Sequence, residues 1–262
     1  MNGGAGTTLL QTTDLSVRLS GALIVDQAAL TLRAGELIAL IGPNGAGKTT
    51  LVRALAGLIP ASGLIELDGR PLADFSARDR ARRIAYLPQG HVFHWPMAVA
   101  AVVALGRYPH ADAFAPLSDA DRAAVSRALT ATATESWAAR PVTTLSGGER
   151  ARVALARALA SEAPILLADE PTVSLDPRHQ LVVMELLARR AREGAAVLAI
   201  VHDLTLAARF ADRIVVMDRG RLVADGSPRE VLTPERIAEV FAVEAVIADS
   251  GLGPMPILHR PL

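Results

Sequence analysis

The sequence predicts an α/β protein with a mostly parallel β-sheet that helices cover on both faces. Short apolar runs alternate with helical patterns along the chain, and this alternation is typical of parallel sheets joined by crossover helices. Hydrophobic residues make up 51% of the 262 positions, which is enough for a large core. The length suits one α/β domain with an inserted lobe.

Composition excludes several classes of function. The formal net charge is zero, which argues against bulk attraction to nucleic acid or anionic lipid. The chain has no cysteine, so it carries no disulfide framework and no thiolate metal site. No apolar run approaches the roughly 20 residues of a membrane-spanning helix, and residues 1–8 do not resemble a secretory signal. We therefore expect a soluble cytoplasmic protein that reaches a membrane only through a partner.

The first third of the chain is predicted to be rich in strands. Strands are expected at 9–19, 22–32, 38–41, 64–67 and 84–87, and a helix at about 48–56. Turns at Ser20-Gly21 and Asp68-Gly69 separate strands, while Gly57 ends the helix. The run 38–41 is apolar throughout, as expected for a buried parallel strand.

The rest of the chain divides into a helical insertion and a second alternating part. Residues 91–145 are alanine-rich, with Ser118 as a helix N-cap before a helix at 119–129. The later helices are expected at 148–161, 178–193, 204–211 and 234–241, and the later strands at 165–168, 196–201, 213–217 and 222–225. The segment Asp218-Arg219-Gly220-Arg221 predicts a hairpin turn.

A glycine-rich loop between strand and helix predicts a phosphate site. It reads Gly42-Pro43-Asn44-Gly45-Ala46-Gly47-Lys48-Thr49-Thr50 and matches the phosphate-loop pattern in full. Its backbone N–H groups would converge on phosphate oxygens at a helix N-terminus. Lys48 would reach the β- and γ-phosphates, and the Thr49 hydroxyl would bind Mg²⁺. The alternative is a glycine-rich turn that binds nothing.

Lys48 is the only lysine in a chain that otherwise uses arginine for its basic residues. Lysine offers a compact ammonium group, whereas arginine offers a wide planar fork. A tight phosphate pocket favours the compact group. The alternative is chance survival of one lysine.

Two further motifs carry chemistry. Asp169 and Glu170 follow the apolar run 165–168, at a strand end where α/β sheets bind ligands. Asp169 fits a Mg²⁺ partner and Glu170 a general base for water; the alternative is a solvated acidic pair. Leu145-Ser146-Gly147-Gly148-Glu149 opens a helix and predicts a second anion-binding helix start, although a capping box alone would also explain it. Two such loops in one chain suggest a head-to-tail dimer, in which Ser146 of one copy faces Lys48 of the other.

With these motifs in place, the chain resembles the ABC-type ATP-binding cassettes over residues 9–245. The phosphate loop, the LSGGE signature at 145–149 and the Asp169-Glu170 pair occur in the family's order and spacing. The resemblance implies a P-loop NTPase (RecA-like) parallel-sheet core, with an N-terminal antiparallel β subdomain and an inserted α-helical subdomain. The implied boundaries form one nucleotide-binding domain at 1–262, with its core at 1–90 and 160–245, its insertion at 91–158 and a C-terminal tail at 246–262.

The resemblance also implies residue roles toward ATP and Mg²⁺. Gln89 would touch Mg²⁺ and the attacking water, Ser174-Leu175-Asp176 would communicate across the dimer, and His202 would contact the γ-phosphate. The implied catalytic residues are Glu170, His202 and Gln89. The implied nucleotide-binding residues are Gly42, Pro43, Asn44, Gly45, Ala46, Gly47, Lys48, Thr49, Thr50, Ser146, Gly147, Gly148 and Asp176. The implied metal ligands are Thr49, Gln89 and Asp169.

Two positions depart from the family pattern. Leu19 stands where many cassettes have an aromatic ring that stacks on adenine, and leucine gives apolar contact without stacking. Base discrimination is therefore in question, while phosphate chemistry is not. Glu149 replaces the commoner glutamine of the signature.

The insertion suggests which cassettes are most similar. The stretches Arg82–Gln89 and Val103–His110, above all Gly106-Arg107-Tyr108-Pro109-His110, resemble importers of iron chelates, haem and cobalamin. The spacing of His91, His94 and His110 matches no compact metal-ligand set. Phe93, Trp95, Pro96 and Met97 are interpreted either as lobe core or as a groove for a permease helix.

The implied assembly is an importer on the cytoplasmic face of the inner cell membrane. The chain would be a peripheral homodimer that docks on two transmembrane permease subunits, which a periplasmic or surface solute-binding protein supplies with cargo. No nucleic-acid partner is expected. The alternatives are a soluble cassette ATPase that acts on nucleic acid, ribosomes or cofactor assembly, and an exporter ATPase.

Overall fold

The computed structural model describes residues 6–90, 93–111, 116–173, 175–249, 251 and 253–262. The chain forms two compact units, one made of residues 1–74 and 187–262 and the other of residues 75–186. The second unit contains the expected insertion at 91–158 and extends beyond it on both sides. Each unit is described separately below.

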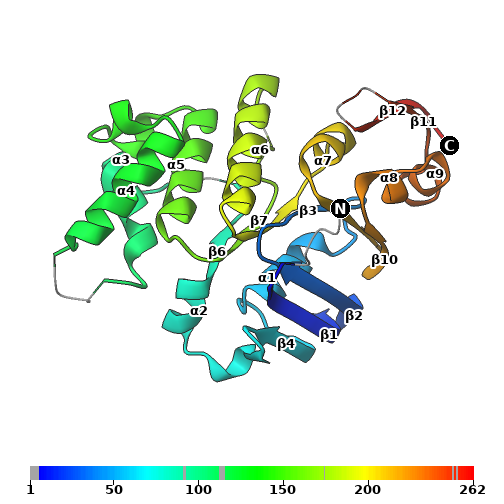
Figure 1. Cartoon of the computed structure of the whole chain (residues 1–262), viewed down its shortest axis with the longest axis horizontal. Helices are drawn as coiled ribbons and strands as arrows, with labels where there is room; N and C mark the ends of the chain where they lie inside the picture. The colour runs from blue at the N-terminus through cyan, green and yellow to red at the C-terminus, as the bar shows by residue number, and fades with distance from the viewer. Residues whose placement is uncertain (1–5, 91–92, 112–115, 174, 250, 252) are drawn as a thin grey trace. The chain divides into compact units, whose positions relative to one another are not determined.

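An antiparallel sheet begins the first unit, as predicted (Figure 1). Its strands are β1 (Thr8–Leu19), β2 (Ala22–Arg33), β4 (Ser62–Leu67) and β5 (Arg70–Pro71), in the order β2-β1-β4-β5. Ser20 (φ 49°) and Gly21 (φ 85°) both adopt left-handed backbone in the β1–β2 turn. Asp68 (φ 50°) and Gly69 (φ 73°) repeat this arrangement between β4 and β5. Two-residue hairpin loops favour this conformation because it matches the twist of the strands.

Parallel strands form the centre of the first unit. Strand β3 (Leu37–Ile41) pairs in parallel with both β8 (Ala196–Ile200) and β9 (Arg213–Asp218), and β10 (Arg221–Gly226) returns antiparallel beside β9. Every residue of β3 and β8 is buried, as expected for strands covered on both faces. The predicted hairpin turn after β9 is confirmed, with Arg219 (φ 44°) and Gly220 (φ 84°) left-handed.

The helices of the first unit are α1 (Lys48–Leu55), α7 (Leu204–Phe210), α8 (Pro228–Val231) and α9 (Pro234–Phe241), with a 3-10 turn η1 (Leu72–Asp74). The chain ends in a hairpin of β11 (Val243–Asp249) and β12 (Pro254–Pro261), which contacts α9 and α7 (Figure 1). The sequence analysis predicted no strands here and ended the core at 245, inside β11. Strand β12 contains several prolines. Proline is confined to edge positions in sheets and counts against a strand assignment, so the sequence pattern did not indicate this strand.

The second unit combines a short parallel strand pair with a helical cluster. Strand β6 (Ile84–Leu87) pairs in parallel with β7 (Ile165–Ala168). Helices α3 (Val99–Ala104), α4 (Asp119–Ala131) and α5 (Gly147–Ala160) gather around one core, drawn in green in Figure 1. The fully buried residues of that core include Val99, Val103, Val142 and Val153. The 3-10 turns are η2 (Leu105–Arg107), η3 (Glu135–Trp137) and η4 (Val142–Thr144), and α6 (Pro177–Arg192) begins in this unit.

Capping residues precede both a helix that the sequence analysis predicted and two short helices that it missed. Ser118 caps α4 with Asp121 in a capping box, as expected from its position. Helix α2 (Ala77–Arg83) was missed, although Ser76 accepts a hydrogen bond from the Asp79 backbone in the same way. Helix α8 was also missed, and it too follows a capping-box serine, Ser227. Both helices are too short for apolar periodicity to reveal them.

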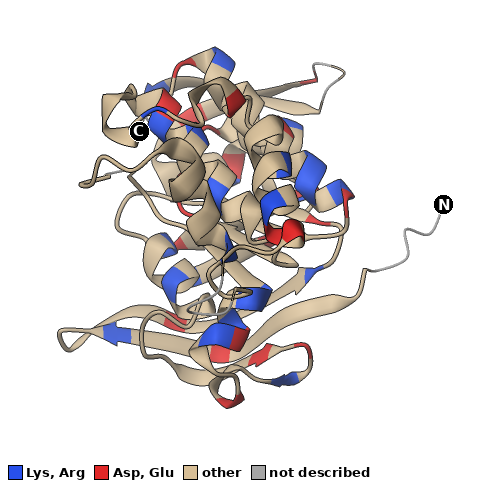
Figure 2. Ribbon diagram, turned by 90° about the vertical axis from the view of Figure 1, so that its left-hand side faces the viewer, with Lys and Arg blue, Asp and Glu red and all other residues tan. Residues whose placement is uncertain are grey.

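Basic and acidic residues are interspersed along the ribbon in Figure 2, and many of them pair. Arg213 contacts Glu36 and Asp225, and Arg107 contacts Asp121. Within the described ranges, no helix is both long enough and apolar enough to cross a membrane.

Candidate nucleotide site

The phosphate loop holds the lone lysine in place. Lys48 Nζ donates to the carbonyl oxygens of Gly42 and Pro43, at 2.8 Å each, and only 6% of the residue is exposed. The ammonium group therefore lies against the loop backbone, where the wide fork of arginine would not fit without displacing it.

Helix α1 begins directly at the loop, with Gly47 as its N-cap residue. The first N–H groups of a helix have no partner inside the helix, and they sit at the positive end of its dipole. Lys48, Thr49 and Thr50 occupy this first turn. The sequence thus places a helix N-terminus, the kind of structure that binds anions, directly after the glycine-rich loop as expected.

Strand β9 and the turn that follows it, at Arg219-Gly220, pack against the phosphate loop. Gly42 has φ 150°, and a Cβ there would lie 2.0 Å from the Met217 carbonyl oxygen. The Gly220 amide donates to the Ala46 carbonyl at 3.0 Å, and the Gly220 carbonyl accepts from the Asp26 amide at 2.8 Å. An ion pair of 2.6 Å between Arg221 and Asp26 closes the arrangement. Sequence analysis predicted this turn but missed its contact with the phosphate loop, since nothing in the local pattern reports it.

His202 lies on the same sheet edge as the phosphate loop. It follows β8, whose Ile200 is in register with Leu40 of β3, and β3 leads into the loop. Ligands of open α/β sheets bind at such carboxyl ends of strands. The next residue, Asp203, caps α7 by accepting from the amides of Thr205 and Leu206.

The second unit places the acidic pair within a hydrogen-bonded cluster. Asp169 is fully buried at the end of β7, and its Oδ2 accepts from the Tyr86 hydroxyl at 3.0 Å. Its backbone N–H donates to the Leu87 carbonyl at 2.9 Å. Gln89 Nε2 donates to Glu170 Oε2 at 2.6 Å. Tyr86 was missed as a site residue, although its place in the strand beside β7 is the signal that could have found it.

The signature at 145–149 forms the capping box that its serine and glutamate predict. Ser146 caps α5, its amide donates to Glu149 Oε2 at 2.7 Å, and the Glu149 amide donates back to Ser146 Oγ at 3.3 Å. The hydrogen bond from the Ser146 backbone lowers the pKa of Glu149 below its usual range. Glutamate in place of glutamine therefore gives this cap an ionised acceptor, while Gly147 and Gly148 form the first turn.

Asp176 is held by a neighbour that the sequence analysis did not identify. Its Oδ1 accepts from the His179 amide at 2.9 Å, and its Oδ2 lies 2.7 Å from His179 Nδ1. These hydrogen bonds lower the pKa of Asp176. Ser174, which belongs to the same motif, lies outside the described residues.

Thr49, Asp169 and Gln89 offer hydroxyl, carboxylate and amide oxygens, the hard donors that Mg²⁺ prefers. These donor types suit the Mg²⁺ of Mg-ATP. Among the described positions, no group of three or more histidine, aspartate or glutamate side chains is placed to hold a metal ion. His91 lies outside those positions.

Comparison with known proteins adds to this geometry. The family described as ABC transporter matches residues 25–173, more than half of the chain. The chain belongs to the ABC transporter family. The hemin import ATP-binding protein of Streptomyces coelicolor is 48% identical over 237 residues, which cover 90% of this ABC chain and 84% of that protein. The cobalamin import ATP-binding protein of Halobacterium salinarum is 45% identical over 255 residues, which cover 96% of this chain and 64% of that protein.

A solved structure shares the fold over nearly the whole length. It is a chain from an inward-facing transporter assigned to the metal-chelate type of ABC transporters. It superposes with a TM-score of 0.82 at 27% identity, and the match covers 97% of each chain. The predicted fold class, a P-loop NTPase of the ABC type, is thereby confirmed.

Proposed function

We propose that this ABC ATPase energises an importer of a metal chelate, with haem as the favoured cargo and an iron–siderophore or cobalamin as the other candidates. The observation that carries the proposal is the 48% identity, over 90% of the chain, to a hemin import ATP-binding protein. The phosphate loop, the acidic pair and the signature are all present in the chain. An importer subunit of this kind would sit peripherally on the cytoplasmic face of the membrane.

Each site residue receives a role toward Mg-ATP. Lys48 and the first amides of α1 bind the phosphates, since they form a preorganised anion site. Thr49, Asp169 and Gln89 would hold Mg²⁺, which would supply positive charge to offset the charge that develops on the phosphates. Glu170 accepts a proton from the attacking water, while Gln89 holds the Glu170 carboxylate in orientation.

Three groups contribute from outside the phosphate loop. His202 donates a hydrogen bond to the γ-phosphate from the end of β8. Ser146, with the amides of Gly147 and Gly148, binds the γ-phosphate held by a second copy of the chain. Asp176 transmits the state of one site to the other.

The head-to-tail dimer has a direct test. Ser146→Ala and Lys48→Ala each remove one half of a composite site. Mixing the two mutants therefore yields heterodimers with one intact site, and ATPase activity returns in part. Activity that stays at the level of the separate mutants contradicts the shared site.

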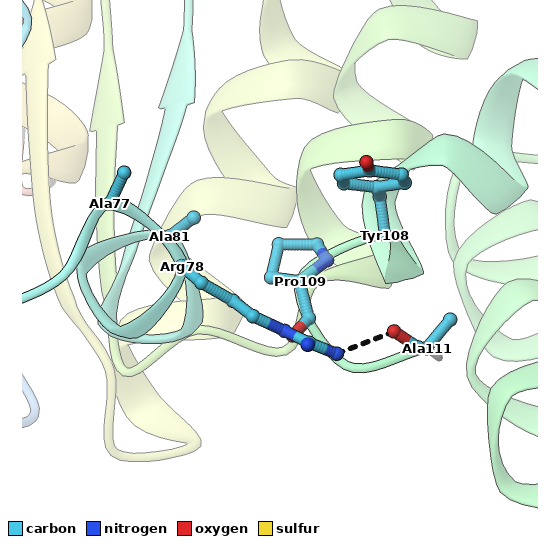
Figure 3. A pocket seen from close by; sticks show the side chains of 6 residues that line it. All are labelled: Ala77, Arg78, Ala81, Tyr108, Pro109 and Ala111. Atoms are coloured by element: carbon cyan, nitrogen blue, oxygen red, sulfur yellow. Dashed lines mark hydrogen bonds between the residues drawn. The ribbon is translucent and has the colours of Figure 1, made fainter. Parts of the chain in front are cut away.

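A groove on the second unit is the proposed contact for the permease. Figure 3 shows Tyr108 and Pro109 facing helix α2 across it. The groove encloses about 400 Å³, and its lining includes Ala77, Ala81 and Ala111. Tyr108 is 71% exposed. A short cytoplasmic helix of a permease would insert an apolar side chain between α2 and Tyr108.

The apolar cluster predicted from sequence divides between two roles. Trp95 is 76% exposed, whereas Phe93 and Met97 pack partly against the core of the helical cluster. Trp95 therefore remains a candidate for permease contact. Met97 belongs with the lobe core, so a charge there should damage folding.

Uptake in cells tests the function. The gene is expressed together with genes for a haem permease and its solute-binding protein in a bacterium that lacks haem import, and growth on haem as the iron source is measured. Trp95→Glu and Tyr108→Glu should abolish growth on haem, while the purified subunit keeps basal ATPase within about twofold. Glu170→Gln should abolish both. Growth on cobalamin or a siderophore instead of haem would reassign the cargo, and no rescue with any of them would refute the importer assignment.

A further inference from the structure

A tyrosine hydroxyl contacts the buried carboxylate of the acidic pair. Tyr86 Oη donates to Asp169 Oδ2 at 3.0 Å, and Asp169 is 0% exposed. Burial of a charged group is unfavourable unless hydrogen bonds replace the water that would otherwise solvate it. The Tyr86 hydroxyl supplies one of these hydrogen bonds.

The pairing of β6 with β7 fixes the tyrosine beside the carboxylate. The two strands are parallel, with Tyr86 in register with Leu167 and Leu87 in register with Ala168. The Asp169 amide donates to the Leu87 carbonyl at 2.9 Å and so extends the pairing past the end of β7. Because the two backbones are held together, the hydroxyl reaches Oδ2 from a fixed position.

The residues that follow β6 provide a second contact of the same kind. Gln89 Nε2 donates to Glu170 Oε2 at 2.6 Å. The segment 86–89 therefore supplies one side-chain donor to each member of the acidic pair. The role assigned above to Gln89 is to hold the Glu170 carboxylate in orientation, and Tyr86 stands in the same relation to Asp169.

The contact between Tyr86 and Asp169 has two possible consequences. If the hydroxyl only satisfies a buried carboxylate, its loss lowers the stability of the fold. If it also orients the carboxylate toward a metal ion, its loss weakens metal binding, because outer hydrogen bonds hold metal ligands in their productive orientation. Asp169 directly follows β7, at the strand end where α/β sheets bind ligands, and this position favours the second consequence.

We propose that Tyr86 is a positioning residue for the Mg²⁺ ligand Asp169, which it orients through the hydrogen bond to Oδ2. The inference rests on the proposed function, because it takes Asp169 as a residue that holds Mg²⁺. Tyr86 acts through Asp169, and its hydroxyl sets how tightly the nucleotide complex binds the metal ion.

The metal affinity of the nucleotide complex tests this inference. The purified full chain is loaded with adenylyl imidodiphosphate, a nonhydrolysable ATP analogue, and Mn²⁺ binding is followed by electron paramagnetic resonance. Tyr86→Phe removes the hydroxyl and keeps the ring. The Mn²⁺ concentration at half-saturation should rise about tenfold, the lower end of the usual effect of losing an outer hydrogen bond to a metal ligand. Affinity for the analogue in EDTA should not change.

Ser118→Ala is the matched control for a lost hydroxyl. Ser118 Oγ donates to Asp121 Oδ2 at 2.6 Å in the same unit, and Asp121 is also buried. This control should lower the melting temperature and leave the Mn²⁺ affinity unchanged. A Tyr86→Phe protein that behaves like the control, with reduced stability and wild-type Mn²⁺ affinity, overturns the inference.

ATPase kinetics give a second readout that a structural role would not produce. Raising the Mg²⁺ concentration should restore most of the ATPase rate of Tyr86→Phe, because the defect is one of metal affinity. Glu170→Gln, which lacks the general base, should show no such recovery. A rate of Tyr86→Phe that stays low at every Mg²⁺ concentration contradicts the inference.

A double-mutant cycle shows whether Tyr86 acts through Asp169. In the Asp169→Asn background, Tyr86→Phe should change the Mn²⁺ affinity by less than about twofold, because the effects of two residues in contact are not additive. An undiminished effect in that background overturns the inference, since Tyr86 would then act on the metal ion by another route.

Failure of the proposed function gives a different pattern. If Asp169→Asn itself leaves the Mn²⁺ affinity at the wild-type value, Asp169 does not hold the metal ion, and the proposed role falls together with the inference. If Asp169→Asn weakens Mn²⁺ binding and Tyr86→Phe does not, only the inference falls.

Discussion

Gln89 donates a hydrogen bond from Nε2 to Oε2 of Glu170 at 2.6 Å. Glu170 itself adopts φ 53°, a left-handed conformation that costs a non-glycine residue on the order of 1 kcal/mol or more. The two observations agree, because a strained backbone and a directed hydrogen bond together fix where the carboxylate points. A general base requires that kind of fixed orientation toward its water.

Replacing this carboxylate separates binding from chemistry. Glu170→Gln should bind Mg-ATP with unchanged affinity and hydrolyse it about 10²–10⁴ times more slowly, the usual contribution of a general base. Single-turnover hydrolysis and nucleotide titration measure the two effects. Hydrolysis at the wild-type rate would remove Glu170 from the mechanism.

The lone lysine provides a second test. Lys48→Arg keeps the positive charge, but the guanidinium cannot donate to the carbonyls of Gly42 and Pro43 from the same position. ATP affinity should fall at least tenfold in equilibrium titration, with little loss of thermal stability. Near-normal affinity would show that the pocket accepts a planar fork, and the argument from compactness would then fail.

The turn behind the phosphate loop predicts an effect at a distance from the nucleotide. Gly220→Ala places a Cβ 2.8 Å from the Ile24 carbonyl in a residue with φ 84°, and so disturbs the bond from Gly220 to Ala46. The KM for ATP should rise several-fold, with a smaller change in kcat. Gly194→Ala is the matched control, since its φ is 101° but nothing lies within 4 Å of the added Cβ. Equal effects in both variants would attribute the change to backbone strain alone.

Adenine recognition is expected to be weak. Leu19 and Leu23, on the β1–β2 hairpin, are 41% and 42% exposed and offer only aliphatic surface. Leu19→Tyr should tighten ATP binding by up to about 1 kcal/mol, the scale of an aromatic contact, and should increase the preference over GTP. Strong discrimination in the wild type would place the adenine elsewhere.

The buried ion pair of the helical cluster predicts a pH dependence of stability. Hydrogen bonds from Ser118, followed by that from Arg107, lower the pKa of Asp121 from 3.8 to about 2. A carboxyl whose pKa is lower in the folded state stabilises the fold above its unfolded value, and this stabilisation is lost as pH falls toward 2. Asp121→Asn should cost about 1–3 kcal/mol at neutral pH.

Urea unfolding at several pH values checks this sign. The difference in free energy of unfolding between wild type and Asp121→Asn should be largest above pH 5 and should shrink between about pH 4 and pH 2. A difference that is constant across this range would contradict an ionised, paired Asp121.

The sequence alone predicted most of the secondary structure and the local motifs of the candidate site. The phosphate loop, the Asp169-Glu170 pair and the Ser146 cap are short-range patterns, in which residue type and spacing specify local backbone and donors. The turns at Ser20-Gly21 and Arg219-Gly220 follow from the same local logic, because few residues tolerate left-handed backbone.

Tertiary structure alone decided the contacts between segments far apart in the chain. Gly220 meets Ala46, Arg107 meets Ala160, and Tyr86 meets Asp169. No local pattern encodes these pairs, since each depends on which strand or helix packs beside which. The β11–β12 hairpin was missed for a related reason. Its strands are defined by pairing with each other and by contact with α7 and α9, whereas their proline content counts against strands when the residues are considered alone.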